Sequence, residues 1–378
     1  MINLLGGAGN SNFGDELIVR AWLDYLQARN PHDAIVVDWA GHDHTIRSMN
    51  HILSEYTKTG NVSFENTLDS LGRLTKKPEF WTSFQRGLNF FERGGFSNYS
   101  QYKHIHKRFS NVKIMHMHGG GFLNAIWPVH AFKLGLMVAA KRKFDCKIVA
   151  TGIGLIPFPD VPQNLLRDFR DAIAEFDCFE TRDVESFDLL RRYCGTIANI
   201  FCGLDDTFLL PQTLRRGESA LHVSHFGDPS HHHTQRLLEQ LKDHHFSMIY
   251  FWACTPEDTN FFQFVRDVFP NATQLSLRDL VLQPLPVSIG DFMVTSRFHP
   301  HLLAARLGAI GVYTTNTSNY YKPKHESIIR LGSPFIFAKD SLPILPQHDR
   351  LFLPMPLLDN MRIAQKIKIA DYIYGHPL

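Results

Sequence analysis

Short apolar runs alternate along most of the chain with longer stretches in which apolar residues recur at helical spacing. Strands that are buried on both faces produce such runs, and a helix between two of them is the usual crossover of a parallel sheet. The pattern therefore predicts an α/β fold. We expect strands at 2–5, 34–37, 112–116, 146–151, 178–180 and 198–201, and in the second half of the chain at 221–224, 248–252, 273–275, 291–295 and 310–313.

A polar segment over 210–219, interrupted by proline and glycine, separates the two sets of strands and predicts a domain boundary near residue 215. We expect an amino-terminal α/β domain over 1–215 and a carboxyl-terminal α/β domain over 216–356. The last segment, 357–378, has a helical pattern, and we expect it to pack back on the first domain. Two doubly wound domains of this kind would face a central cleft, with ligands at the carboxyl ends of the strands.

The segment from about 57 to 107 interrupts the alternation. Large apolar side chains recur there at loosely helical spacing, which predicts a helical insertion that serves as a lid or an interface patch. These side chains are Leu71, Leu74, Phe80, Trp81, Phe84, Leu88, Phe90 and Phe91.

Composition excludes several classes of protein. The 378 residues carry a net charge of only +2, so no overall field attracts nucleic acid or an anionic membrane. The five cysteines form no CxxC pair, which favours reduced thiols in the cytoplasm. The first residues lack the pattern of a secretory signal, and no apolar run is long enough to span a bilayer. We expect a cytoplasmic protein without a transmembrane segment.

The first predicted strand leads into a glycine-rich turn, Gly6 to Glu16, and a helix that begins near Gly14. Free backbone N–H groups at such a turn suit an anion or a sugar hydroxyl. The turn lacks a full dinucleotide fingerprint and the Lys-Ser/Thr pair of a Walker loop. Asn12 and Asp15 either cap the helix, or Asp15 binds a hydroxyl and acts as a base.

The strand that ends near His116 continues into His118 and three glycines, Gly119, Gly120 and Gly121. Consecutive glycines cost backbone entropy, so something approaches this backbone closely, and we favour a ligand over packing. His116 and His118 share one face of an extended strand, which is also a metal-like spacing. Because no third ligand lies nearby in sequence, we predict no metal site.

Cationic residues follow three other strands. Arg182 suits phosphate or carboxylate, or pairs with a neighbouring acid. Arg297 and His299 stand two residues apart at the start of a helix, which predicts an anion-binding pair with a proton donor. Lys324 adds positive charge to the same edge.

Other polar runs are interpreted as ordinary structure. Asp205 and Asp206 lack the spacing of a metal-binding Asp-x-Asp motif, and we expect them to serve a turn at the hinge between the domains. We interpret His42 and His44 as loop residues, and 231–233 as an exposed loop of three histidines.

Six ordered motifs between residues 2 and about 332 resemble the polysaccharide pyruvyl transferase family. They are Asn12-Phe13-Gly14-Asp15, Gly119-Gly120-Gly121, Thr181-Arg182-Asp183 with Ser186, Asp205-Asp206, Ser296-Arg297-Phe298-His299 and Tyr321-Lys322-Pro323-Lys324. The resemblance implies a two-domain GT-B-like fold. It also implies transfer of the enolpyruvyl unit of phosphoenolpyruvate onto a sugar of a bacterial surface polysaccharide, exopolysaccharide or cell-wall glycan, usually as a pyruvate ketal.

The resemblance also assigns roles to residues. Arg182, Arg297 and Lys324 match positions that bind phosphoenolpyruvate, and His299 matches the acid. The first-domain motifs match the acceptor side, with Asp15 as a second catalytic residue; they comprise Asn12, Gly14, Asp15, His118, Gly119, Gly120 and Gly121.

The residue chemistry agrees with this assignment, because phosphoenolpyruvate needs cations for its phosphate and carboxylate and a proton donor for its methylene carbon. The scheme requires no metal and no cofactor. Two alternatives stay open: a GT-B-type glycosyltransferase that uses a nucleotide sugar, and a non-catalytic glycan-binding module. The sequence also leaves open the identity of the acceptor sugar, a lipid-linked acceptor at the inner face of the membrane, and the oligomeric state.

Overall fold

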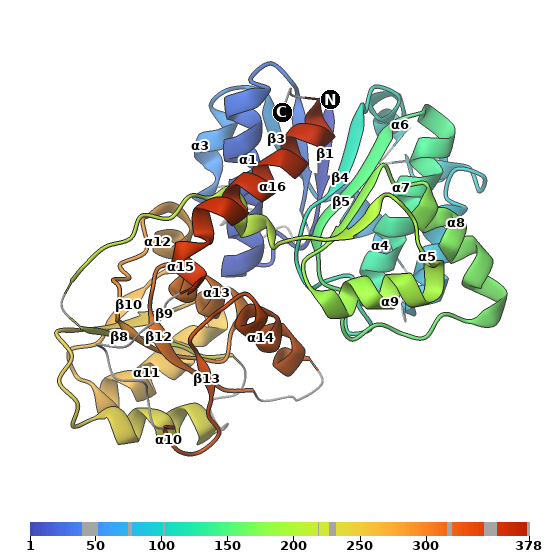
Figure 1. The fold of residues 1–378 in the computed structure, drawn as a ribbon. Helices are drawn as coiled ribbons and strands as arrows, with labels where there is room; N and C mark the ends of the chain where they lie inside the picture. Colours follow the sequence, from blue (N-terminus) through green and yellow to red (C-terminus); the bar gives the residue numbers. More distant parts are fainter. Residues whose placement is uncertain are drawn as a thin grey trace. The chain divides into compact units, whose positions relative to one another are not determined.

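The chain folds into two compact α/β units, each built on one parallel sheet (Figure 1). The computed structural model describes residues 1–39, 52–74, 78–100, 103–217, 219–226, 232–315, 320–343 and 354–375. The first unit comprises Met1–Asn10, Asp15–Leu209 and Lys366–Leu378, and the second comprises Ser11–Gly14 and Leu210–Gln365. His42, His44 and His231 lie outside the described residues.

The sheet of the first unit has the strand order β3-β2-β1-β4-β5-β6-β7, and every neighbouring pair is parallel. The strands are β1 Ile2–Leu5, β2 Ile35–Asp38, β3 Val62–Glu65, β4 Ile114–Met117, β5 Lys147–Ile153, β6 Cys178–Thr181 and β7 Ile200–Cys202. The order reverses between β1 and β4, which is the topological switch point where open α/β sheets bind ligands.

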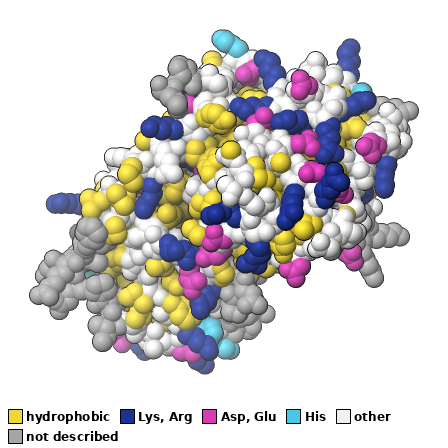
Figure 2. Space-filling model, turned by 45° about the vertical axis from the view of Figure 1, so that its right-hand side comes forward, with side chains coloured by type: hydrophobic (Ala, Val, Ile, Leu, Met, Phe, Trp, Pro, Cys, Tyr) yellow, Lys and Arg dark blue, Asp and Glu magenta, His cyan; other side chains and the backbone are white. Residues whose placement is uncertain are grey.

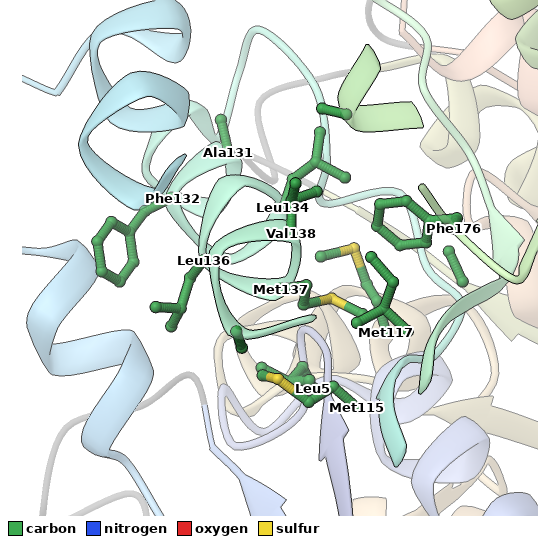
Figure 3. Packing of buried hydrophobic residues seen from close by; sticks show 14 of the residues in the cluster. Leu5, Met115, Met117, Ala131, Phe132, Leu134, Leu136, Met137, Val138 and Phe176 are labelled. Atoms are coloured by element: carbon green, nitrogen blue, oxygen red, sulfur yellow. The ribbon is translucent and has the colours of Figure 1, made fainter. Parts of the chain in front are cut away.

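The helices of this unit connect the strands. They are α1 Phe13–Arg29, α3 Ser54–Thr57, α4 Thr67–Gly72, α5 Phe80–Leu88, α6 Lys103–Phe109, α7 Ala131–Phe144, α8 Leu166–Ala174 and α9 Val184–Cys194, with 3-10 turns at Gly95–Asn98, Pro128–His130, Gln163–Leu165 and Asp206–Leu209. The first ten residues of α7 are buried, so this helix is apolar around most of its circumference. Figure 3 shows Met137 of α7 near Leu5 and Met115 of the sheet, whereas Phe132 and Leu136 point to the other side.

The second unit repeats the same topology, with the strand order β10-β9-β8-β11-β12-β13 and parallel pairing throughout. Its strands are β8 Ala220–Ser224, β9 Met248–Trp252, β10 Thr273–Leu275, β11 Phe292–Thr295, β12 Ile310–Tyr313 and β13 Ile336–Phe337. Its helices are α10 His232–Leu241, α11 Thr259–Val268, α12 Leu277–Leu282, α13 Phe298–Arg306, α14 Tyr321–Arg330 and α15 Pro354–Leu357, with a 3-10 turn at Pro256–Asp258. The switch point here lies between β8 and β11.

The α/β fold is confirmed, and each of the eleven predicted strands occurs with ends shifted by at most a few residues. The sequence pattern missed β3 and β13. Only one of the four residues of β3 is buried, so it has no apolar run, and β13 has two residues. The structure therefore corrects the purely helical interpretation of 57–107, because this segment also supplies the edge strand of the first sheet.

The aromatic residues of that segment pack into the core rather than forming a lid or an interface patch. Phe80, Phe84 and Phe90 are buried in the same cluster as α7. Two glycines let α5 and α7 cross at backbone contact: a Cβ atom on Gly87 would lie 2.1 Å from the Phe132 carbonyl oxygen, and one on Gly135 would lie 2.2 Å from that of Phe84.

The last helix, α16 Asp359–Tyr374, is divided between the units at Gln365/Lys366. In its second half, Ile373 packs against Val149 and Cys178, and the Tyr25 hydroxyl donates to Asp371 at 2.7 Å. The final turns of the chain are thus part of the first unit, whose other boundary lies at Leu209/Leu210.

Figure 2 shows basic and acidic side chains interleaved on the face in view, without a broad patch of one sign. This distribution agrees with the small net charge of +2. No helix among the described parts of the chain combines the length and apolar character needed to cross a membrane.

We expect Gly87→Ala to destabilise the protein by about 1–3 kcal/mol, because the added methyl group meets backbone atoms of α7 that cannot move aside. Alanine normally stabilises an exposed helix position relative to glycine, so the sign of the effect is diagnostic. Thr82→Ala, at an exposed position of the same helix, is the control. Urea unfolding measures both variants, and equal stability of Gly87→Ala and the wild type would contradict the close crossing.

Candidate functional site

The predicted site residues lie at the carboxyl ends of the strands, around the switch point of each sheet. In the first unit, the glycine-rich turn follows β1 and the His118 segment follows β4. In the second unit, Arg297 follows β11, and Phe226 follows the adjacent β8. Parallel strands direct their carboxyl ends to one edge, which is why motifs far apart in sequence meet there.

The glycine-rich turn packs tightly against the segment after β4. A Cβ atom on Gly6 would lie 1.9 Å from the His118 imidazole, so only glycine leaves room for that ring. The Asp15 carboxylate adjoins both glycine segments, because a Cβ atom on Gly7 would lie 3.4 Å, and one on Gly120 3.2 Å, from its Oδ1 atom. The structure therefore brings Asp15, His118 and Gly120 together.

A buried lysine is hydrogen-bonded to the same turn. The Lys133 ammonium group of α7 donates to the Gly6 carbonyl oxygen at 3.2 Å. It also lies 3.3 Å from the Asp38 carboxylate and 3.5 Å from that of Asp69. Burial raises the pKa of Asp38 to about 6, although the nearby lysine opposes this shift.

Asp206 forms the centre of a second buried network in the first unit. Its Oδ2 atom accepts hydrogen bonds from the Gly119 amide at 2.6 Å, the Trp22 indole at 2.8 Å and the Thr151 hydroxyl at 2.9 Å. Its Oδ1 atom lies 2.5 Å from the Lys366 ammonium group. The expected turn is present, because Asp206 begins the 3-10 turn Asp206–Leu209, which ends at the boundary of the first unit. Its fully buried side chain has the further role of holding this network together.

This network explains part of the glycine run. A Cβ atom on Gly119 would lie 2.9 Å from the Gly152 carbonyl oxygen and 3.0 Å from Asp206 Oδ2. Gly152 has a positive φ of 59°, which glycine adopts without strain. Gly154 donates to the Gly120 carbonyl oxygen at 2.9 Å, so the glycines extend the pairing of β4 with β5. We expected a ligand close to this backbone, but at Gly119 the closely approaching atoms belong to the protein itself.

Lys366, from the carboxyl-terminal helix, is shared between two buried carboxylates. Its ammonium group lies 2.5 Å from Glu180 and 2.5 Å from Asp206, and none of the three side chains is exposed. Burial raises the pKa of Glu180, and the lysine only partly offsets it. Burial also opposes the charge of Asp206, but Lys366 and other hydrogen-bond donors outweigh it and lower the pKa of that carboxyl.

The two histidines after β4 are buried, and burial lowers the pKa of His116 to about 3 and of His118 to about 4. His116 is hydrogen-bonded to the Tyr374 hydroxyl at 2.7 Å and to the Thr151 hydroxyl at 2.8 Å. Both rings are neutral near pH 7 and belong to the interior. No group of three or more His, Cys, Asp or Glu side chains in the described ranges is arranged to hold a metal ion.

Arg182 is buried beside carboxylates. Its guanidinium donates to Asp205 at 3.1 Å and lies 4.0 Å from Asp183. The salt bridge that the sequence left open as an alternative is therefore formed. Asp205 also accepts from the Thr207 amide at 3.0 Å and from the Thr207 hydroxyl at 2.7 Å, so it is a buried counter-ion that also serves the turn expected here.

In the second unit, Arg297 is buried directly before α13. It donates to the His225 carbonyl oxygen at 2.8 Å and to the Thr255 hydroxyl at 3.2 Å, and it forms an ion pair with Asp258. Burial opposes its charge, but Asp258 outweighs burial and raises the pKa of the guanidinium. Thr255 and Asp258 form a capping box before α11, which fixes this carboxylate.

His299 lies in the first turn of α13, with its ring against the chain at Gly14. A Cβ atom on Gly14 would lie 1.7 Å from the His299 Nδ1 atom, so glycine is required for this approach. The Asn12 side chain accepts from the Gly14 amide at 3.1 Å, which is the capping role that the sequence left open. Asn12 and Gly14 thus lie in the second unit, where Gly14 contacts the predicted acid, whereas Asp15 belongs to the first.

A chain of aromatic contacts joins Arg297 to Lys324. The Arg297 guanidinium lies 5.1 Å from the Phe226 ring centroid, and the Phe226 and Tyr321 centroids are 4.8 Å apart. The Lys324 ammonium group lies 5.5 Å from the Tyr321 ring and 3.5 Å from the Tyr320 ring. The structure therefore brings two of the predicted donor-binding residues to one region of the second unit.

Other histidines near the motifs belong to the interior or to helix starts. His301 is stacked on His325, with their Nδ1 atoms 2.8 Å apart, and burial lowers the pKa of both rings. The expected exposed loop at 231–233 is partly wrong, because α10 begins at His232, and His233 is hydrogen-bonded to Asp340 at 2.9 Å.

Comparison with known families gives one decisive match. The sequence model of the polysaccharide pyruvyl transferase family matches residues 12–261, about two thirds of the chain. The chain belongs to the polysaccharide pyruvyl transferase family. The matched range includes Asp15, the glycines after β4 and Arg182, and it ends before Arg297, His299 and Lys324. This assignment identifies a transferase of polysaccharide biosynthesis, and a saccharide acceptor agrees with it.

Solved structures show the same fold at low sequence identity. A UDP-N-acetylglucosamine 2-epimerase superimposes with a TM-score of 0.54 at 13% identity, covering 100% of this chain and 98% of that one. UGT71G1 from Medicago truncatula, complexed with UDP-glucose, gives 0.52 at 9% identity and 98% coverage of each chain. A putative UDP-N-acetylglucosamine 2-epimerase from Listeria monocytogenes gives 0.51 at 13% identity, with 97% of this chain and 90% of that one covered. The family member thus has a GT-B fold. A search of curated proteins finds no match.

We expect Lys366→Met to destabilise this pyruvyl transferase family member by about 3–5 kcal/mol, because it leaves two buried carboxylates without their cation. The loss should grow from pH 5.5 to pH 8. Without Lys366 the pKa values of both carboxyls rise in the folded state. The folded variant is therefore most stable while these carboxyls are protonated, and it loses that stability as the pH rises through their raised pKa values.

Thermal unfolding across this pH range measures the effect. Lys368→Met removes an exposed lysine from the same helix and is the control. Adding Glu180→Gln to Lys366→Met should recover stability most at pH 8, because it removes one of the two stranded charges. A loss that is independent of pH would contradict the charge-based explanation.

Proposed function

We propose that this protein transfers the enolpyruvyl unit of phosphoenolpyruvate onto a sugar of a bacterial surface polysaccharide or exopolysaccharide and closes it into a pyruvate ketal. The observation that carries the proposal is the group formed by Arg297, His299 and Lys324 in a member of this family. Arg297 and His299 follow β11, and Lys324 is linked to Arg297 through Phe226 and Tyr321. The second unit thus carries two cations and an imidazole, the groups that a substrate with a phosphate, a carboxylate and a protonatable carbon requires.

The charge balance of this region favours an anionic donor. Arg297 and Lys324 bring two positive charges, Asp258 offsets one, and the amino-terminal end of α13 adds its dipole. Asp258 also holds the guanidinium in place before a ligand arrives, since it is fixed by its capping box. We assign Arg297 and Lys324 to phosphoenolpyruvate. Arg182, the third residue of this prediction, lies in the first unit, where it is paired with Asp205.

The proposed reaction proceeds in two additions at one carbon. The His299 imidazolium gives a proton to the methylene carbon of phosphoenolpyruvate, and positive charge develops at C2. The oxygen of the first sugar hydroxyl bonds to C2 as its proton passes to a carboxylate base. The C2–oxygen bond to phosphate then breaks, and phosphate leaves with the electron pair. A second hydroxyl bonds to C2 and closes the ketal, and its proton passes to the His299 imidazole, which restores the acid. No metal or cofactor enters this scheme.

The first unit would bind the acceptor. Asp15 stands beside the backbone of Gly7 and Gly120, and we assign its carboxylate to the sugar hydroxyls. The proposal extends to a saccharide acceptor carried on a lipid at the inner face of the membrane, with the protein in the cytoplasm.

We expect Arg297→Ala to weaken phosphoenolpyruvate binding at least tenfold, because one charge-assisted hydrogen bond to a charged group contributes about 1.5–3 kcal/mol. Calorimetric titration measures the affinity. Since the single variant leaves Asp258 buried and unpaired, Arg297→Ala with Asp258→Asn is the second variant, and it should bind equally weakly. Arg236→Ala, which removes an exposed pair with Asp340 in the same unit, is the control.

The same titration separates this proposal from a nucleotide-sugar glycosyltransferase. Binding heat on titration with UDP-glucose or GDP-mannose, and none with phosphoenolpyruvate, would overturn the proposal of pyruvyl transfer. Unchanged phosphoenolpyruvate affinity in both Arg297 variants would overturn the assigned pocket.

We expect His299→Gln to retain the fold and phosphoenolpyruvate binding but to lower the rate of phosphate release by about 10²–10⁴-fold, because the amide cannot supply a proton. Release of inorganic phosphate is followed with phosphoenolpyruvate and a panel of methyl glycosides and disaccharides. A variant that keeps the wild-type rate would move the acid role to another residue.

A further inference from the structure

An exposed tryptophan stands on an ordered loop beside the glycine segment of the first unit. Trp127 is 51% exposed, and its neighbour Ile126 is 44% exposed. Trp22, Trp39 and Trp252 have no exposed surface. Trp127 and Ile126 are neighbours, so the loop presents an aromatic ring and an aliphatic side chain together to solvent.

The loop that carries Trp127 is held in place by hydrogen bonds. The Asn124 side chain donates to the Gly121 carbonyl oxygen at 2.6 Å and accepts from the amides of Ile126 at 2.9 Å and Trp127 at 3.2 Å. The Ala125 amide donates to the Pro157 carbonyl oxygen at 2.8 Å. The indole is thus presented from a backbone that is fixed before any ligand binds, which lowers the entropic cost of binding.

The same loop begins at the residues that adjoin Asp15. Gly120 lies beside the Asp15 carboxylate, and Gly121 is joined to Trp127 through the single side chain of Asn124. Phe122 packs against both glycine segments, because Cβ atoms on Gly7 and Gly120 would lie 3.3 Å and 2.9 Å from its ring. The loop therefore begins beside the Asp15 carboxylate and carries a flat apolar surface at Trp127.

We propose that Trp127, with Ile126, is the platform on which a sugar ring of the acceptor lies. A pyranose has polar hydroxyls at its edge and an apolar face of C–H groups, so it needs hydrogen-bonding groups on one side and an aromatic ring on the other. The inference rests on the proposed function, which supplies the acceptor. It adds a residue that would bind this acceptor away from the reacting atoms.

Tryptophan fluorescence of the full-length protein tests the platform without phosphoenolpyruvate. Iodide should quench the exposed Trp127 preferentially, and Trp127→Phe should remove most of this quenching. Methyl hexosides, methyl N-acetylhexosaminides and disaccharides are then titrated as probes. We expect at least one of them to change the emission and to protect it from iodide in the wild type, and to do neither in Trp127→Phe.

Kinetics provide the second readout. With the saccharide found by fluorescence, Trp127→Ala should raise the acceptor KM about tenfold and change kcat less than threefold, because the lost contact is equal in the ground and transition states. Trp127→Phe should recover part of the affinity. Tyr372→Ala is the control: Tyr372 is 61% exposed and lies over Lys147, the first residue of β5, at the opposite edge of the sheet.

The outcomes separate the two proposals. Saccharide protection of Trp127 without phosphoenolpyruvate-dependent phosphate release supports the platform and overturns pyruvyl transfer. Phosphate release with an unchanged acceptor KM in Trp127→Ala overturns the platform and leaves the reaction intact. A blue shift of Trp127 emission with phosphatidylglycerol vesicles, and no response to any saccharide, would overturn the platform in favour of a membrane contact.

Discussion

The ion pairs of Lys366 with Glu180 and Asp206 are the interaction on which the first unit depends. Three charged side chains without exposed surface are costly to bury, and only their mutual neutralisation and the surrounding donors make the arrangement stable. The Asp206 carboxylate in turn fixes the glycine segment through its hydrogen bond from the Gly119 amide, and it fixes α1 through its hydrogen bond from Trp22. The geometry around Asp15 therefore depends on a lysine 351 residues later in the chain.

Both units use the same topology but organise their switch points differently. In the first, a buried carboxylate holds backbone in place, and glycines permit the contact. In the second, a buried carboxylate holds a cation in place, and the Phe226 and Tyr321 rings connect it to Lys324. In the proposed function, the first arrangement would bind the neutral hydroxyl groups of the acceptor, and the second would bind the anionic donor.

The sequence predicted the parts of the fold that apolar runs encode. Doubly buried strands such as β1 and β12 were predicted with their observed ends, whereas β3 was missed because it is a half-exposed edge strand. Arg182, Arg297 and His299 were singled out because they follow strands. The sequence left open an acid beside Arg182, but it named neither Asp205 as its partner nor Asp258 as the partner of Arg297. The capping box of Thr255 and Asp258 was a sequence signal that could have identified Asp258. Lys366, on the buried face of an otherwise ordinary terminal helix, gave only the weak signal of a charge among apolar positions.

The division of α16 between the units has a consequence for synthesis. On the ribosome the chain emerges from its amino terminus, and domains usually fold as soon as they are complete. Here the first unit receives Lys366 and the final turns of α16 only after the whole second unit has been made. The domain that is translated first is thus completed last, and until then Glu180 and Asp206 lack their cation.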